Sequence, residues 1–337
     1  MSQDRPKLIR DDIIIAYTTD REAMAKAAAE KLDGMGVTLE LIPISLKKFA
    51  CSEYLPRVSG NVRGRDVFLF QGFGKNPNVD IWNFLLTLDA LHLADAKSIT
   101  PVIPYIPYLR QDRKDKSRVP ISASRIIRSI EMCPGVKRVI TTDMHADQLQ
   151  AVFTIPVDHI PGRVFFIPWA RERFKNDFSN VVAVAPDIGS VKRVRSLAKR
   201  LDDNMSLAIL DKERTDEGVE VHTVIGDSVQ GKICLINDDI VDTGGTLKEA
   251  IDALMSFGPR EVIVTVTHPV FSKSNGTTAY EKLMEAGIEL ITTDSIPTEN
   301  HSWLTVLPLT EYMAQVIFEQ ISRDGSVSKI IEEGLPQ

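Results

Sequence analysis

Short apolar runs and longer amphipathic stretches alternate along most of the chain. The first pair is Ile13 to Tyr17 followed by an alanine-rich stretch over 21–34, with Thr18, Thr19 and Asp20 as candidate helix caps between them. Further strands are expected at 66–70, 99–106, 137–142, 180–186, 205–210, 232–237, 261–267 and 288–292. Short, continuously apolar strands are typical of parallel sheets that helices cover on both faces. The pattern therefore predicts an α/β fold.

The length of 337 residues predicts two domains. The stretch 155–162, IPVDHIPG, carries two prolines and a glycine after the first group of strands, which is typical of a change of domain. We therefore expect an N-terminal domain over 1–160 and a C-terminal domain over 161–337. From Leu309 onward the sequence is typical of one or two helices, which are candidates to pack back on the first domain.

Charge and composition narrow the range of partners. The 40 basic and 46 acidic residues give a net charge of −6, which disfavours a nucleic-acid partner. No apolar run approaches the roughly 20 residues of a membrane span, and the first ten residues carry no secretion signal, so we expect a cytoplasmic protein. The three cysteines, Cys51, Cys133 and Cys234, are odd in number and scattered, which argues against a disulfide framework and a structural zinc.

The segment 232–246, KICLINDDIVDTGGT, is the strongest functional signal. An apolar strand runs into Asp238 and Asp239, then Asp242, and then the turn Thr243-Gly244-Gly245-Thr246 that opens a helix. Glycines let backbone amides approach a ligand, and a helix N-terminus favours an anion, so the turn is suited to hold a phosphate. The neighbouring carboxylates are suited to accept hydrogen bonds from sugar hydroxyls. A plain capped strand-to-helix turn is the alternative, but three carboxylates at this spacing favour a sugar phosphate site.

Three further segments place charged residues after predicted strands. The segment 110–118, RQDRKDKSR, has a local charge of +3, which suits a polyphosphate, although a solvated loop is the simpler interpretation. His145 follows the strand that ends near Thr142, and a lone histidine more often has a structural role. Asp187 follows the strand at 180–186, where it would also serve as a helix N-cap.

The motif DDIVDTGGT resembles the phosphoribosyl pyrophosphate fingerprint of type I phosphoribosyltransferase folds. Together with 104–122, PYIPYLRQDRKDKSRVPIS, and 142–148, TDMHADQ, it makes the chain similar to ribose-phosphate diphosphokinases, the phosphoribosyl pyrophosphate synthetases, from about residue 37 to about 297. The resemblance implies two similar phosphoribosyltransferase-type domains, each a mostly parallel sheet flanked by helices. It also implies transfer of the diphosphoryl group of MgATP to the C1 hydroxyl of ribose 5-phosphate, giving 5-phosphoribosyl 1-pyrophosphate and AMP.

The resemblance also assigns roles to residues of this sequence. It implies that Lys212 and Arg214 are catalytic and grip the transferred group, and that His145 and Asp187 position Mg2+. It implies ATP binding by Arg110, Gln111 and His145, with Phe49 and Glu53 reaching ATP from a neighbouring subunit, so the enzyme should be a homo-oligomer. The residues implied to bind ribose 5-phosphate are Asp238, Asp239, Asp242, Thr243, Gly244, Gly245 and Thr246.

Some positions depart from the family pattern. Cys51 and Thr154 stand where aspartates are usual, Asn61 replaces a serine, and Ser190 replaces a glycine in the loop after Asp187. The departures at Cys51, Asn61 and Thr154 put the usual regulation in doubt. Two alternatives to the synthetase also remain open. One is a catalytically silent regulatory subunit associated with a synthetase, and the other is a phosphoribosyltransferase that uses the same diphosphate.

Overall fold

The computed structural model describes residues 8–74, 76–214, 220–274, 276–298 and 301–335, with only the backbone at 8, 212–214 and 220–222. Contacts divide the chain into two compact units. Unit 1 comprises residues up to Pro161 together with Ser295–Pro297 and the segment from Pro308 onward. Unit 2 comprises Gly162–Asp294 and Thr298–Leu307. The C-terminal helices thus belong to the same unit as the N-terminal half.

Unit 1 is built on a seven-stranded sheet in the order β3-β2-β1-β4-β5-β6-β7. Neighbouring strands are parallel except for β2 and β3, which form an antiparallel hairpin at one edge. Its strands are β1 (Leu8–Thr18), β2 (Val37–Lys48), β3 (Tyr54–Val58), β4 (Asp66–Phe70), β5 (Ser98–Ile103), β6 (Val139–Thr142) and β7 (Val157–Ile160). Its helices are α1 (Glu22–Gly34), α2 (Pro77–Leu93), α3 (Ser122–Glu131), α8 (Thr310–Ile321) and α9 (Val327–Glu333), with short 3-10 turns at Thr19–Arg21 and Asp147–Val152.

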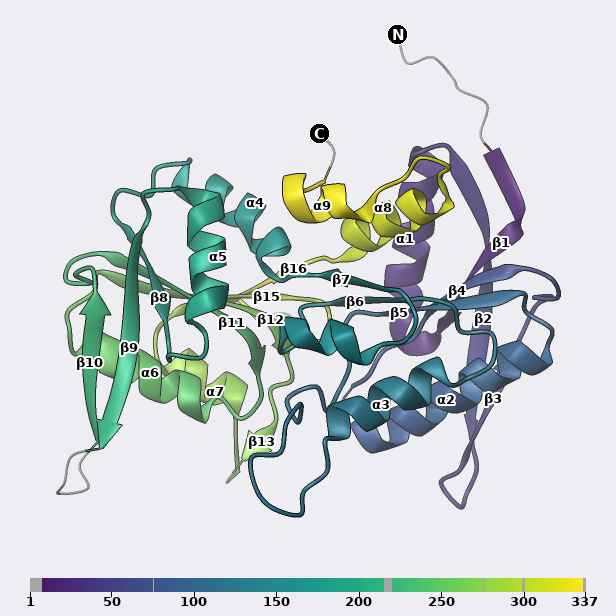
Figure 1. Cartoon of the computed structure of the whole chain (residues 1–337), viewed down its shortest axis with the longest axis horizontal. Helices are drawn as coiled ribbons and strands as arrows, with labels where there is room; N and C mark the ends of the chain where they lie inside the picture. Colours follow the sequence, from purple (N-terminus) through teal and green to yellow (C-terminus); the bar gives the residue numbers. More distant parts are fainter. Residues whose placement is uncertain (1–7, 75, 215–219, 275, 299–300, 336–337) are drawn as a thin grey trace, which may run out of the picture. The chain divides into compact units, whose positions relative to one another are not determined.

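Helices cover both faces of the unit 1 sheet. Apolar residues of α2 and α3, such as Phe84 and Ile127, pack on one face of the strands in a single core cluster. Helix α1 lies on the other face, and α8 packs beside it, where Lys31 of α1 pairs with Glu311 of α8 (Figure 1). Gln320 at the end of α8 also donates a 2.6 Å hydrogen bond to Asp158 of β7. These contacts make the C-terminal segment an integral layer of unit 1.

Unit 2 repeats this plan with the strand order β10-β9-β8-β11-β12-β15-β16. Only the pairing of β9 with β10 is antiparallel in this sheet. The elements of unit 2 are α4 (Arg163–Phe174), β8 (Val181–Ala185), α5 (Val191–Leu201), β9 (Ser206–Arg214), β10 (Glu220–Gly226), β11 (Ile233–Val241), α6 (Gly245–Met255), β12 (Glu261–Pro269), β13 (Lys273–Ser274), β14 (Thr277–Thr278), α7 (Ala279–Glu285), β15 (Glu289–Thr293) and β16 (Leu304–Leu307).

The central strand β11 explains how unit 2 is layered. Its even-numbered residues Cys234 and Ile236 pack against α6 and α7, whereas the odd-numbered Ile233 and Leu235 pack against α4 and α5. Successive side chains of a strand point to opposite faces, so a continuous apolar run is required when both faces are covered. The predicted α/β class, with two mostly parallel sheets flanked by helices, is confirmed.

The structure contains strands that the sequence pattern did not predict. Strands β2 and β3 carry Pro43 and Pro56, and proline is uncommon within strands. Strand β7 lies inside the proline-containing stretch interpreted as a domain change. Strand β9 continues to Arg214, beyond the expected end near 210, because it pairs with β10. None of the helices in the described parts of the chain is long and apolar enough to cross a membrane.

Two adjacent residues of α6 test the layering of unit 2. Leu254 is fully buried, whereas Met255 is half exposed. We expect Leu254→Ala to lower the free energy of unfolding of unit 2 by about 2–5 kcal/mol, since it leaves a cavity in the core. Urea-induced unfolding followed by circular dichroism measures this change. The matched control Met255→Ala should cost less than about 1 kcal/mol, and equal losses in the two variants would contradict the layering.

Candidate active site

The carboxyl end of β11 carries two adjacent carboxylates in a buried strand. Asp239 is only 4% exposed and lies on the α5 side of the sheet, where its Oδ1 is 3.4 Å from Nη2 of Arg193. Asp238 lies on the α6 side, and its Oδ1 accepts a 2.9 Å hydrogen bond from the amide of Asp239. Burial and the neighbouring charge of Asp239 raise the pKa of Asp238 to about 8. The strand end therefore holds a tightly coupled acidic pair that favours a partner offering hydrogen-bond donors.

Arg193 was not predicted as a site residue from the sequence. It lies in the first turn of α5 and is 22% exposed, and the signal that could have found it is the basic helix start K-R-V-R after Asp187. A buried carboxylate requires a compensating charge. Arg193 supplies this charge from the helix that covers the same face of β11.

The turn after β11 leaves the N-terminus of α6 open. Gly244, the N-cap residue, has φ +71°, and no side chain caps the helix. A Cβ at Gly244 would lie 3.0 Å from the Cβ of Ala279, so a glycine is required there by both conformation and space. The side chains of Thr243 and Thr246 are exposed beside the turn. Uncapped amides and exposed hydroxyls at a helix N-terminus form a binding site suited to an anion.

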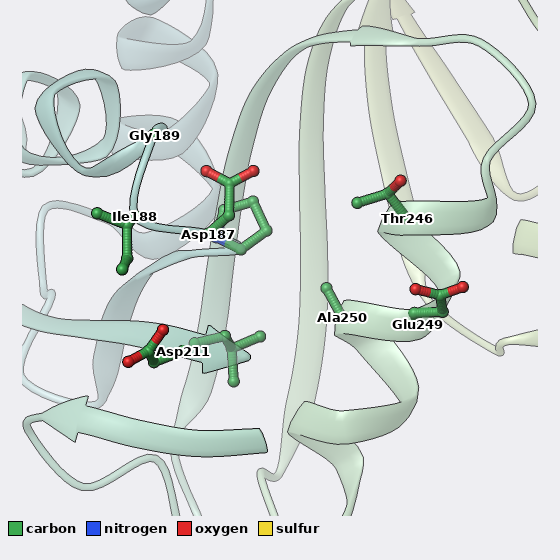
Figure 2. Close-up of a pocket in the computed structure, with 9 residues that line it drawn as sticks. Asp187, Ile188, Gly189, Asp211, Thr246, Glu249 and Ala250 are labelled. Carbon is green, nitrogen blue, oxygen red and sulfur yellow. The ribbon is translucent and has the colours of Figure 1, made fainter. Parts of the chain in front are cut away.

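A cavity of about 330 Å3 adjoins this turn within unit 2. Figure 2 shows the loop from Pro186 to Gly189, together with Asp211 of β9, on one side, and Thr246, Glu249 and Ala250 of α6 on the other. Asp187 and Thr246, which follow two neighbouring strands in the sheet, thus border one cavity. The remaining residues predicted to bind ribose 5-phosphate lie within β11 and the turn that follows it.

Ser190, where the family pattern has a glycine, fits the loop without strain. Its φ is −85°, which any residue adopts. Its amide donates a 2.7 Å hydrogen bond to Oδ1 of Asp187, and its hydroxyl donates to the Asp187 carbonyl at 2.9 Å. The serine therefore fixes the orientation of the Asp187 carboxylate, and this departure leaves the loop intact.

The two residues predicted to be catalytic, Lys212 and Arg214, lie near the end of β9. Their backbones pair with those of His222 and Glu220 of β10. Their side chains lie outside the described part of the structure, as do residues 215–219. Their proposed role therefore rests on sequence.

The residues predicted to bind ATP in unit 1 follow two neighbouring strands. Arg110 and Gln111 come after β5, and His145 comes after β6, which pairs with β5. All three side chains are exposed, and Oε1 of Gln111 accepts a 2.6 Å hydrogen bond from Ser122. Because these strands are parallel, the three residues lie at the same edge of the sheet.

Phe49 and Glu53 lie on the hairpin between β2 and β3. The amide of Phe49 donates a 2.8 Å hydrogen bond to the Glu53 carbonyl, and both side chains are exposed. The sheet order places β1 and β4 between this hairpin and β5, so β2 and β5 are roughly 14 Å apart at the usual strand spacing. The sheet of one chain thus keeps the hairpin apart from Arg110, Gln111 and His145.

Family models and named relatives match most of the chain. Residues 13–133 match the family described as the N-terminal domain of ribose phosphate pyrophosphokinase, and residues 167–298 match the phosphoribosyl transferase domain. Ribose-phosphate pyrophosphokinases of Hyphomonas neptunium and Corynebacterium efficiens are 39% and 38% identical to this chain; each match covers 92% of the chain, and 96% and 92% of those proteins.

A solved structure extends the agreement to the fold. Phosphoribosylpyrophosphate synthetase from Mycobacterium smegmatis superposes with a TM-score of 0.81 at 30% identity, covering 96% of this chain and all of the other. The two units therefore have the phosphoribosyltransferase-type fold expected from the sequence. From the domain matches, the relatives and this structure together, the chain belongs to the ribose-phosphate pyrophosphokinase family.

Proposed function

We propose that this protein transfers the diphosphoryl group of ATP to the C1 hydroxyl of ribose 5-phosphate, giving 5-phosphoribosyl 1-pyrophosphate and AMP. The observation that carries the proposal is the open N-terminus of α6 beside the carboxylates of β11, in a chain whose relatives carry the pyrophosphokinase name. The domain match at 13–133 is to ribose phosphate pyrophosphokinases in particular, which favours synthesis of the diphosphate over its use by a phosphoribosyltransferase.

Unit 2 has one proposed binding site for the phosphate of ribose 5-phosphate and another for its ribose hydroxyls. The 5-phosphate binds the amides and hydroxyls of the turn Asp242–Thr246, where the positive end of the α6 dipole favours its charge. The ribose hydroxyls donate to Asp238 and Asp239. The turn backbone and the carboxylates of β11 would hold the sugar at two points, so the C1 hydroxyl is oriented before it reacts.

Binding of ATP is proposed for unit 1 and for a neighbouring chain. Arg110, Gln111 and His145 hold the nucleotide, while Phe49 and Glu53 of a second copy hold the adenine by stacking and hydrogen bonding. The exposed side chains of the hairpin support this arrangement, because in one chain β1 and β4 separate the hairpin from β5 and β6. A homo-oligomer in which the ATP site is shared follows from the proposal.

The transfer itself needs charge compensation. The C1 oxygen forms a bond to the β-phosphorus while the bond between that phosphorus and the bridging α,β-oxygen breaks. AMP leaves with that oxygen, and the hydroxyl proton passes to water. Lys212 and Arg214 hold the negative charge of the group in transfer, for which positioning and electrostatic stabilisation are sufficient.

A divalent cation, Mg2+, is proposed to accompany ATP. The described residues include no group of three or more His, Cys, Asp or Glu side chains able to hold a metal by themselves. Mg2+ is commonly held by one or two carboxylates together with substrate phosphates and water, so the single carboxylate of Asp187 fits an ion that arrives with the nucleotide. His145 remains the second proposed contact. When bound, the cation neutralises charge on the phosphate oxygens.

Phosphorus NMR tests the reaction directly. The purified chain incubated with MgATP and ribose 5-phosphate should produce AMP and the diphosphate signals of the phosphorylated sugar, in equal amounts. Omitting the sugar is the control and should suppress AMP. A folded protein that forms no AMP with both substrates would instead support the alternative of a catalytically silent subunit.

Gly244→Ala tests the turn proposed to bind the phosphate of the sugar. The added methyl group at φ +71° and 3.0 Å from Ala279 should distort the turn, raising KM for ribose 5-phosphate about tenfold or more and leaving KM for ATP within about twofold. Gly258→Ala is the matched control, since Gly258 also has φ +71° but its nearest neighbour is Cγ of Gln230 at 3.9 Å. Steady-state kinetics that find the two variants alike would remove the turn from the sugar site.

Mixing inactive chains tests the shared ATP site. Glu53→Ala and Lys212→Ala disable different parts of one composite site, so each variant alone should be nearly inactive. After dissociation and random reassembly, about a quarter of the sites should combine an intact Lys212 with an intact Glu53 from the neighbour, and activity should return to about that fraction of the wild-type rate. A mixture that never exceeds either parent would argue against sites shared between subunits.

A further inference from the structure

Unit 1 contains a second cavity, of about 630 Å3, at the carboxyl ends of β1, β2 and β4. Thr19 and Asp20 line it after β1, and Leu46 and Lys48 line it from β2. After β4 it is lined by Gln71, Gly72, Phe73, Gly74, Asn76, Val79, Asp80 and Asn83. None of the residues proposed to bind ATP or ribose 5-phosphate lines this cavity. Its volume is in the range of small-molecule sites.

This cavity is the topological counterpart of the unit 2 cavity beside the proposed ribose 5-phosphate site. The two sheets have the same strand order, so β1, β2 and β4 correspond to β8, β9 and β11 (Figure 1). Asp20 after β1 corresponds to Asp187 after β8, and helix α2 corresponds to α6. In α/β sheets, ligands bind where chain connections diverge from neighbouring strand ends, which is the position of both cavities.

The chemistry of the two turns is different. In unit 1 the turn amides are already bonded to carboxylates, because Gly72 donates to Oδ2 of Asp20 at 3.0 Å and Gly74 donates to Oδ2 of Asp80 at 2.8 Å. Burial and the charge of Asp20 raise the pKa of Asp80, as expected for two acidic groups beside one cavity. The positions that suit a phosphate in unit 2 are therefore taken by negative side chains in unit 1.

A buried amide gives independent evidence for a ligand. Gln71 lines the cavity and is only 2% exposed, yet its Oε1 has no hydrogen-bond partner among the described residues. A buried polar atom without a partner costs about 1–3 kcal/mol. Asn83 of α2, which is 5% exposed, lines the same cavity. Such groups are satisfied by a molecule that presents hydrogen-bond donors to them.

We propose that the unit 1 cavity binds a small, uncharged, hydroxyl-rich molecule of the free pentose class and disfavours its phosphorylated form. The hydroxyls donate to Gln71, Asp20 and Asp80, while Leu46, Phe73 and Val79 contact the carbon skeleton. The described carboxylates of Asp20 and Asp80 already accept from the amides of Gly72 and Gly74, so the amides that would hold a phosphate are taken.

Ligand-observed saturation-transfer NMR on the full chain tests the proposal, with D-ribose as the probe. The Gly244→Ala background weakens the phosphate-binding turn of unit 2 but leaves Asp238 and Asp239 in place, so the dependence of D-ribose binding on Gln71 is what assigns that binding to unit 1. In that background, Gln71→Met should weaken D-ribose binding about tenfold or more, because it removes the acceptor at nearly constant volume. Gln230→Met, at an exposed position in unit 2, is the matched control and should leave binding unchanged.

Every outcome of this experiment decides the proposal. Saturable D-ribose binding that depends on Gln71, with ribose 5-phosphate binding at least about tenfold more weakly in the same background, supports it. No saturable binding of D-ribose, binding insensitive to Gln71→Met, or equal binding of the two sugars would overturn it. Binding of Mg2+ alone that depends on Gln71 and excludes D-ribose would identify a cation site instead.

Two controls keep this test independent of folding and of the proposed reaction. Thermal unfolding must find Gln71→Met folded at the assay temperature; otherwise Asn83→Leu, which changes the same cavity from α2, replaces it. Failure of the phosphorus NMR assay would overturn the proposed reaction without changing the expected role of Gln71. Conversely, loss of the pentose site would leave the reaction intact.

Discussion

The two adjacent aspartates at the buried end of β11, Asp238 and Asp239, determine much of what unit 2 can bind. Two neighbouring carboxylates lose hydration and repel one another, so they persist only where cations or donors compensate them. Arg193 compensates Asp239 from one face, which requires α5 to begin against that part of the sheet. Asp238 accepts a hydrogen bond from the amide of Asp239, and its side chain also interacts with that of Asp239. The strand end is thus acidic and ordered before a substrate arrives.

The sequence predicted the parts of the fold that depend on local pattern. The continuous apolar runs at 66–70, 181–185 and 261–267 are strands in the structure because both of their faces are buried. The turn at Gly244 was also predictable, since two glycines between a strand and a helix indicate close backbone approach. The family followed from motifs spread over most of the chain, and the comparisons confirm it.

Features that depend on distant contacts were not predictable in this way. Strands β2 and β3 contain prolines and are stabilised by pairing rather than by propensity. Asp20 was expected as a helix cap, but α1 begins at Glu22 without a side-chain cap, and the carboxylate instead bonds the amide of Gly72, 52 residues away. The partnership of Arg193 with Asp239 likewise joins two elements that are separate in sequence. Local pattern carries no information about such pairings.

The return of the chain to unit 1 has a consequence for its synthesis. Helix α8, which covers part of α1, is made only after all of unit 2, about 150 residues after β7. Translation proceeds at roughly 5–20 residues per second. The apolar surface of α1 that α8 later covers therefore stays uncovered for on the order of ten to thirty seconds during synthesis. Unit 2 is also completed late, because its last strand β16 (Leu304–Leu307) is made directly before α8. The surface of α1 that α8 covers is accessible to chaperones and proteases during this interval.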